Sequence, residues 1–205
     1  IDYFTMTPKH CTPLERPTYT IDNNKEPLVC VATDKEATST QIQMFYKHPA
    51  KDVKTWGDYR EQYLVNSLFE IMFDERLAEL GEKKSCPYMQ AGAGYGGFLA
   101  RPVAAYQMYV VAKEGKVMEA LEAMMLENRR LQQHGFLQTE LDRAKESLLE
   151  RFERAAKEES KTESSRIAAE LVDYFLENTP MPGAIIENKW AKAMMDGITL
   201  EEVNA

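Results

Sequence analysis

Two kinds of hydrophobic pattern follow one another along the chain, one with the period of a strand and one with the period of a helix. Leu28–Thr33 is a short run of β-forming residues, and Ser39–Lys47 alternates apolar and polar side chains, so we predict two strands there. Met89–Phe98 and Val103–Ala112, rich in Tyr and Val, predict a second pair of strands that is joined by residues 99–102.

Apolar residues at spacings of three and four predict the helices. These helices are expected at 58–80, 117–134, 139–155, 167–175 and 184–195. Gly135 follows the second of them as a C-terminal stop. The polar interval 157–163 predicts a solvated bend or a helix that leaves the core. Near the C-terminus Thr199 and Glu202 have the spacing of a capping box, which predicts the start of a further helix.

The order strand, strand, helix, strand, strand, helix, helix predicts an α+β fold, with an antiparallel or mixed sheet and helices packed on one face. Residues 1–27 hold Pro8, Pro13, Pro17 and Pro27 among polar residues and are predicted to be a linker that leads into a single domain at 28–205. Because the chain begins at Ile1 and its last helix has room for only about two turns, we expect a domain from a longer protein.

Composition and charge narrow the classes of function. The 205 residues include 25 Lys and Arg against 33 Asp and Glu, a formal net charge of −8, and no basic patch interrupts this balance. A nucleic-acid partner is therefore not expected. No apolar run approaches the length of about 20 residues that spans a bilayer, so no membrane span is expected either. The three cysteines are scattered and indicate neither a disulfide framework nor a zinc ribbon.

Gly92–Gly97, with the sequence GAGYGG, satisfies the dinucleotide pattern G-x-G-x-x-G. A nucleotide site would need a strand before the glycines and a helix after them, whereas here a polar turn precedes them and Pro102 follows closely. No Gly-Lys-Ser/Thr follows to form a phosphate-binding loop. The stretch is instead interpreted as a glycine-rich strand or loop where the backbone approaches another group closely.

The sequence contains no self-contained active site that a motif would reveal. His10, His48 and His134 are far apart, and neither H-E-x-x-H nor H-x-x-E-H occurs, so no metal ligand is assigned to the chain. Spacings of three and four along one helix favour a solvated, ion-paired face. The residues with those spacings are Glu140, Arg143, Glu146, Glu150, Arg151 and Arg154. Tyrosines beside the glycines could form a peptide-binding edge, but packing is the favoured interpretation.

Several short motifs, taken in order, resemble the pitrilysin/insulinase family of zinc peptidases, and most closely its bacterial branch of large, periplasmic-type proteins. The resemblance covers about residues 14–205. The motifs are Asp34–Thr38 followed by Tyr46–Lys47, then Arg76–Leu80, the AGAGYG strand, His134–Phe136, Glu140–Lys145 and Ile198–Asn204.

The resemblance implies a fold like that of the mitochondrial-processing-peptidase-like metallohydrolases, in the form of the partner domain that lacks the zinc motif. It implies no cofactor in this chain and zinc in the parent protein, held by a companion domain of the same polypeptide. The parent would then be a zinc metalloendopeptidase whose chamber encloses peptide substrate, with a periplasmic location favoured. The alternative is a scaffold or assembly domain of a catalytically silent relative.

Some family members place an arginine and a tyrosine of a zinc-free domain on the bound peptide. Tyr88 matches the tyrosine and is the one possible substrate contact, whereas Gly81 stands where the arginine would fall. Arg76 matches a structural position. Leu137 replaces a threonine that often caps a helix in the family, so Thr139 is expected to cap the helix one turn later, with Asp142.

Overall fold

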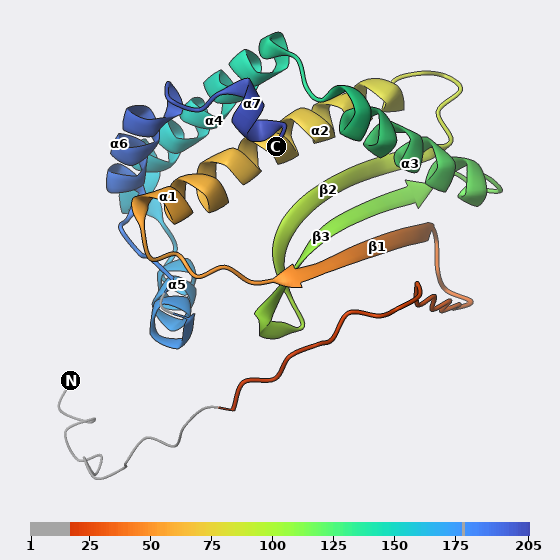
Figure 1. Ribbon diagram of the computed structural model, residues 1–205, viewed down its shortest axis with the longest axis horizontal. Helices are drawn as coiled ribbons and strands as arrows, with labels where there is room; N and C mark the ends of the chain where they lie inside the picture. The colour runs from red at the N-terminus through yellow and green to blue at the C-terminus, as the bar shows by residue number, and fades with distance from the viewer. Residues whose placement is uncertain (1–16, 178) are drawn as a thin grey trace.

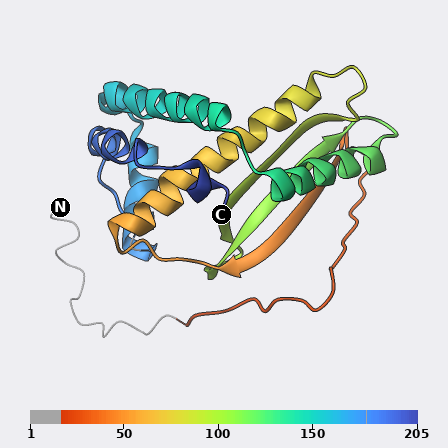
Figure 2. The same cartoon turned by 45° about the horizontal axis from the view of Figure 1, so that its top comes forward.

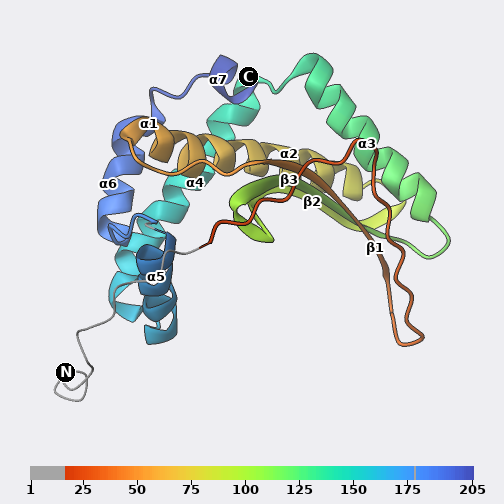
Figure 3. The same cartoon turned by 60° about the horizontal axis from the view of Figure 1, so that its bottom comes forward.

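The computed structural model describes residues 17–177 and 179–205, in which a three-stranded sheet lies under a group of helices (Figure 1). The strands are β1 (Thr40–Pro49), β2 (Tyr88–Phe98) and β3 (Ala100–Ala112), in the order β1-β3-β2, and both pairings are antiparallel. The helices gather on one side of the sheet (Figure 3). The predicted α+β class is confirmed, and the sheet is antiparallel throughout.

The helices follow the predicted segments closely. They are α1 (Trp56–Tyr59), the π-helical η2 (Arg60–Val65), α2 (Asn66–Gly81), α3 (Val117–His134), α4 (Gln138–Glu158), the 3₁₀ turn η3 (Glu159–Lys161), α5 (Ser164–Glu177), α6 (Ala184–Met195) and α7 (Leu200–Val203). The capping box predicted for the last helix is present in part, because the Glu202 N–H donates to the Thr199 hydroxyl.

One continuous helical rod replaces the predicted helix 58–80. It begins two residues earlier than predicted, at Trp56, because Thr55 and Asp58 form a capping box there. The segment η2 then widens the rod by π-type hydrogen bonds before α2 continues it. Spacings of three and four cannot distinguish a π-turn from an α-turn over six residues, so the sequence did not reveal η2.

The core lies between α2 and the face of the sheet that the helices cover. Leu68, Met72, Phe73 and Leu77 of α2 are fully buried and meet the inner face of the sheet, to which Met108 belongs. In Figure 2, α2 and α3 cross this same face, and α4 lies beyond α2. Burying a large apolar side chain contributes about 1.5–3 kcal/mol, so this layer is the main stabilising contact of the domain.

Three local predictions are wrong. Leu28–Thr33 forms no strand and is exposed, because β1 pairs only with β3 and leaves this run without a partner. Pro102 lies within β3, where its carbonyl accepts from the Ala50 N–H, and only Leu99 separates β2 from β3. Helix α4 begins at Gln138 rather than after Thr139, because the Glu140 carboxylate accepts from the Leu137 N–H and caps the turn earlier.

The predicted linker at 1–27 is described only from residue 17 onward, where no helix or strand forms up to Ser39. Pro8, Pro13, His10 and Cys11 lie outside the described residues. In the described ranges no helix is both long and apolar enough to cross a membrane.

Candidate functional site

The side chains of the types that commonly bind metals are dispersed over the described residues. Within residues 17–177 and 179–205, no three His, Cys, Asp or Glu side chains gather as a metal site would require. His48 lies on β1, and His134 ends α3. The donors that the described residues offer therefore do not fit a zinc ion, and we assign no zinc chemistry to them.

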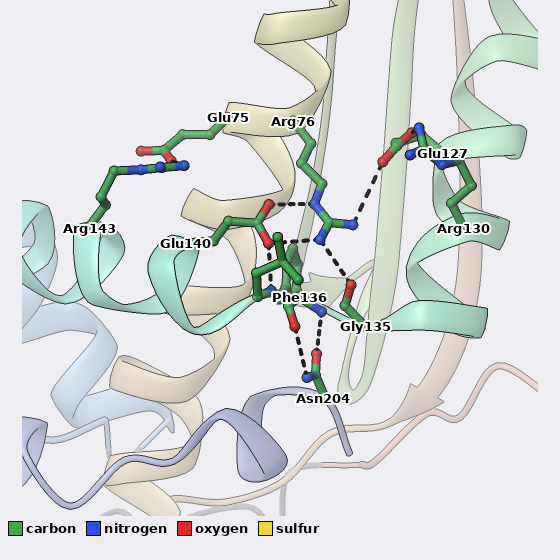
Figure 4. Close-up of polar contacts among 10 residues, drawn as sticks. Glu75, Arg76, Glu127, Arg130, Gly135, Phe136, Glu140, Arg143 and Asn204 are labelled. Atoms are coloured by element: carbon green, nitrogen blue, oxygen red, sulfur yellow. Dashed lines mark hydrogen bonds and ion pairs between the residues drawn. The ribbon is translucent and has the colours of Figure 1, made fainter.

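Arg76 is the centre of the most connected polar cluster (Figure 4). Its Nε donates to Glu140 Oε1 at 2.6 Å, and its Nη2 donates to Glu140 Oε2 at 2.8 Å and to the Gly135 carbonyl at 2.9 Å. Glu127 adds an ion pair at 3.7 Å from Nη1. We call Arg76, Glu127, Gly135 and Glu140 the Arg76 cluster. It ties α2 to the junction between α3 and α4.

Opposite charges meet inside the Arg76 cluster in a partly buried place. The Glu127 side chain is only 5% exposed, and Arg130 donates to its second oxygen at 2.9 Å. Burial works to raise the pKa of Glu140, but hydrogen bonds from Arg76 and from the Leu137 N–H hold that pKa below its usual value. Glu140 therefore forms a partly buried bidentate ion pair with Arg76 and also caps α4. The prediction that it belongs to a solvated helix face is wrong.

The C-terminus of the chain closes the same junction. Asn204 Oδ1 accepts from the Phe136 N–H at 2.8 Å, and the Arg76 guanidinium lies 4.8 Å above the centre of the Phe136 ring. Gly135 has φ +66°, and a Cβ there would lie 2.8 Å from the Asn204 side chain, so only glycine fits. The residues 134–136 and 204 that supported the family resemblance thus meet at one structural joint.

A cavity of about 450 Å³ opens beside the Arg76 cluster and is lined mainly by charged side chains. The Arg76 donors that face it are already bonded to Glu140 and to the chain. A ligand there would have to displace existing partners, so the cluster is best explained as a structural joint. The sequence signal for it was Glu127, which falls between Met124 and Leu131 on the buried stripe of α3.

Tyr88, the one predicted substrate contact, is the first residue of β2 and is 3% exposed. Its hydroxyl donates to the Leu77 carbonyl of α2 at 2.7 Å, and burial raises its pKa above the ordinary range. A contact between this hydroxyl and a peptide would require the bond to α2 to open.

The free edge of β2 is closed by two carboxylates of α2. Asp74 Oδ1 accepts from the Ala93 N–H at 3.1 Å, and Glu70 Oε1 accepts from the Tyr95 N–H at 2.8 Å. Burial raises the pKa of both carboxyls, although each hydrogen bond opposes that rise. These bonds satisfy N–H groups that would otherwise be open to pairing with another strand.

Alternate glycines of GAGYGG, Gly92 and Gly94, lie on the face of the sheet that the helices leave uncovered. Gly92 lies opposite Tyr109 and Gly94 opposite Gln107 in the register of β2 and β3. A Cβ at Gly92 would lie 2.7 Å from the Tyr109 ring, so the predicted close approach is a tyrosine packed on bare backbone. The predicted strand is confirmed.

Amide and aromatic side chains share this uncovered face, because alternate residues of a strand point to the same side. We call it the open face. It comprises Gln41, Gln43, Phe45 and Lys47 of β1, Gln90 of β2, and Gln107 and Tyr109 of β3. Gln43 lies opposite Tyr109, Phe45 lies opposite Gln107, and the Gln90 amide donates to the Tyr109 hydroxyl at 3.0 Å. Such a face offers hydrogen-bonding and apolar contact, and its one cation in this set, Lys47, donates to the Asp22 carbonyl and to Asn24 Oδ1.

Comparisons with known proteins relate the chain to proteases. No protein-family model matches it. It is 24% identical over 192 residues, 94% of its length, to "Zinc protease PQQL-like" of Arabidopsis thaliana. It is 23% identical over 173 residues, 84% of its length, to "Probable zinc protease PqqL" of Escherichia coli. The chain spans 17% and 18% of these two relatives, respectively.

Solved structures share the fold. The first half of the periplasmic protease PqqL from Escherichia coli matches with a TM-score of 0.74 and 25% identity, over 83% of this chain and 36% of that one. A peptidase M16 inactive domain from Pseudomonas fluorescens matches with a TM-score of 0.52 and 18% identity, over 82% of this chain and 37% of that one. Together these matches confirm the family resemblance that the sequence predicts.

Proposed function

We propose, from the premise that this chain is a pitrilysin/insulinase-type domain, that it is the non-catalytic companion of a zinc-bearing domain in a larger bacterial metalloendopeptidase. The observation that carries the proposal is the alignment of 94% of the chain with a protein named as a zinc protease, of which it covers only 17%. A domain of this kind would act as part of a longer polypeptide.

The division of labour between the two domains follows from their side chains. Zinc in the companion domain would polarise the scissile carbonyl and activate water. The described residues of this chain supply no matching donor set, and their polar clusters are satisfied internally. This chain would therefore help to enclose and bind the peptide and would supply no catalytic group.

The open face is the surface best suited to the wall of a peptide chamber. Amide and aromatic side chains outnumber its one charged member, Lys47, and no described helix covers it (Figure 3). Uncharged amides can donate to and accept from the backbone of any unfolded peptide, and an aromatic ring adds apolar contact. Contacts of this type would hold substrates of varied sequence.

Peptide hydrolysis by the full-length parent tests the proposed activity. We expect it to cleave an unfolded protein substrate, to lose that activity on chelation and to regain it with added zinc. A parent that carries matching domains but cleaves nothing under these conditions would contradict the proposal and favour the scaffold alternative.

The role of the open face is tested separately in the same full-length parent. Gln43→Ala is expected to raise KM for peptide several-fold with kcat unchanged, because it removes a binding contact that is equal in ground and transition states. Lys157→Ala, an exposed change on α4 away from the sheet, is the matched control and should change neither constant. Equal KM values for both variants would show that the open face does not bind the peptide substrate.

A further inference from the structure

The run Leu28–Thr33 has the composition of a strand but no pairing partner among the described residues. We call it the strap. Its side chains Leu28, Val29 and Val31 are 81%, 85% and 81% exposed, whereas β-forming residues ordinarily pack beside a neighbouring strand. Only residues 34–39 separate the strap from β1, so β1 is the strand within its closest reach.

The outer edge of β1 is open to pairing. In the described ranges β1 pairs with β3 alone and lies at one end of the sheet. The Ala50 N–H donates to the Pro102 carbonyl at 2.9 Å, which continues the register of the two strands. Because hydrogen bonds to one neighbour alternate along an antiparallel strand, the even-numbered residues of β1 bond to β3. Gln41 and Gln43 therefore turn their N–H and C=O groups toward the outer edge.

A turn between the strap and β1 fixes which residues would pair. The Ala37 N–H donates to the Asp34 carbonyl at 3.3 Å, and Asp34 Oδ1 accepts from the N–H two residues further on at 2.7 Å. A hairpin that continues from this turn sets Cys30 opposite Gln41, in a hydrogen-bonded pair. Gln41 is one of the residues whose backbone groups face the outer edge, so the turn and the edge agree.

A contact far from the turn has the same register. Lys47 Nζ donates to the Asp22 carbonyl and to Asn24 Oδ1. Asn24 lies ten residues before Asp34, and Lys47 lies ten residues after Ala37, so the hairpin would set these two residues opposite each other. The chain is thus already held beside β1 before and after the strap, while the strap itself is unpaired.

We propose that the strap closes on the outer edge of β1 as a fourth strand, with Cys30 opposite Gln41, and that the structure shows its open state. Closure gives the edge groups of β1 partners and brings Val29 beside Ile42, which packs against the core. Cys30 would join the open face and widen the surface that the proposed function gives to the peptide. Only this last consequence rests on the proposed function.

Disulfide formation in the full-length parent tests the register. Gln41→Cys sets a thiol opposite Cys30, where paired Cα atoms are about 5.5 Å apart, a separation that a disulfide spans. Gln43→Cys is the matched control, because it lies on the same face but about 9 Å from Cys30, too far for a disulfide. Both variants carry Cys11→Ser. After mild oxidation, we expect mass spectrometry to find the disulfide to Cys30 at least ten-fold more often in Gln41→Cys.

Amide hydrogen exchange without any added thiol measures how far the closed state is populated. In the parent, the N–H groups of Gln41 and Gln43 should exchange at least ten-fold more slowly than in a Cys30→Pro variant. Proline lacks the N–H that would donate to the Gln41 carbonyl, so it prevents this pairing. The change lies in an exposed run, which leaves the core of the domain intact.

Three outcomes would overturn the inference. Equal disulfide yields from the two variants would remove the register, and a disulfide that joins two polypeptides would make the strap an exchanged strand. Equal exchange of Gln41 and Gln43 with and without Cys30→Pro would show that the strap stays open. The hydrolysis assay is independent, because a parent that cleaves no peptide can still close its strap, and an active parent with an open strap loses only this inference.

Discussion

Helices α2 and α5 both carry apolar residues at spacings of three and four, but they differ in burial. Leu68, Met72 and Leu77 of α2 are fully buried, whereas Leu171 and Val172 of α5 are about half exposed. A periodic apolar pattern therefore predicts that a helix has a face to be covered, and says nothing about whether the cover lies in the same domain. In this chain α2 lies in the core, whereas Leu171 and Val172 of α5 lie outside it.

The largest expected effect contrasts two leucines. Leu68→Ala should lower the free energy of unfolding by about 3 kcal/mol, because it leaves a cavity in a closed core. Leu171→Ala should change it by less than about 0.5 kcal/mol, as is usual for exposed positions. Urea unfolding of this chain measures both. Similar losses for the two variants would mean that α5 is packed within the domain after all.

The same two leucine variants can be compared in the full-length parent. If the companion domain covers α5, Leu171→Ala should cost more there than in this chain alone, while the cost of Leu68→Ala should stay the same. A Leu171→Ala effect that does not depend on the rest of the polypeptide would mean that no further domain covers Leu171.

Arg76 offers the next largest effect. Arg76→Ala leaves the carboxylates of Glu127 and Glu140 without their main partner, and losing one member of a buried pair costs about 3 kcal/mol. Arg143→Ala is the control, because its 3.9 Å pair with Glu75 is exposed and is worth about 0–1 kcal/mol. Thermal unfolding should give a clearly lower Tm for Arg76→Ala than for Arg143→Ala. An equal, small loss would show that the cluster does not join α2 to α3 and α4.

Tyr88→Phe separates packing from substrate binding. Removal of the hydroxyl leaves the Leu77 carbonyl without this donor, so we expect a loss of about 1 kcal/mol in unfolding free energy. KM for peptide in the full-length parent should be unchanged. A raised KM with unaltered stability would instead support the substrate contact that the family resemblance implies.

The smallest expected effect is a pH dependence at the β2 edge. Because the pKa of Glu70 is raised in the folded chain, its stabilising contribution is complete below the unfolded pKa of about 4 and is lost as pH rises through the folded pKa. Glu70→Gln keeps an oxygen for the Tyr95 N–H but cannot titrate. Unfolding free energies measured from pH 4 to 7 should therefore fall less steeply in this variant, whereas an unchanged slope would contradict the assignment.

Local patterns predicted much of the fold. The fold class, the positions of the long helices and the strand at GAGYGG were predictable because spacing and glycine content are read directly from neighbouring residues. The sequence could not show that Leu28–Thr33 forms no strand. A run of β-forming residues becomes a strand only where another strand lies beside it to pair with. The cap at Leu137 depended on Glu140, which the spacing alone had assigned to a solvated face.

The polar clusters could not be predicted from the spacing of residues along the chain. Arg76 and Glu140 are 64 positions apart, and Asn204 and Phe136 are 68 apart, so only the folded chain brings them together. One signal was present in the sequence, because Glu127 interrupts an apolar stripe and a buried charge needs a partner. The exposure of Leu171 and Val172 had no signal in the sequence, because apolar residues at helical spacing predict a face but not how much of it is covered.

The location of zinc in the full-length parent tests the central claim most directly. Anomalous X-ray scattering at the zinc edge from crystals of that protein would show where the metal lies relative to this chain. We predict a zinc peak in the companion domain and none among the residues of this domain. A fully occupied zinc bound by side chains of this chain would contradict the account of a non-catalytic partner.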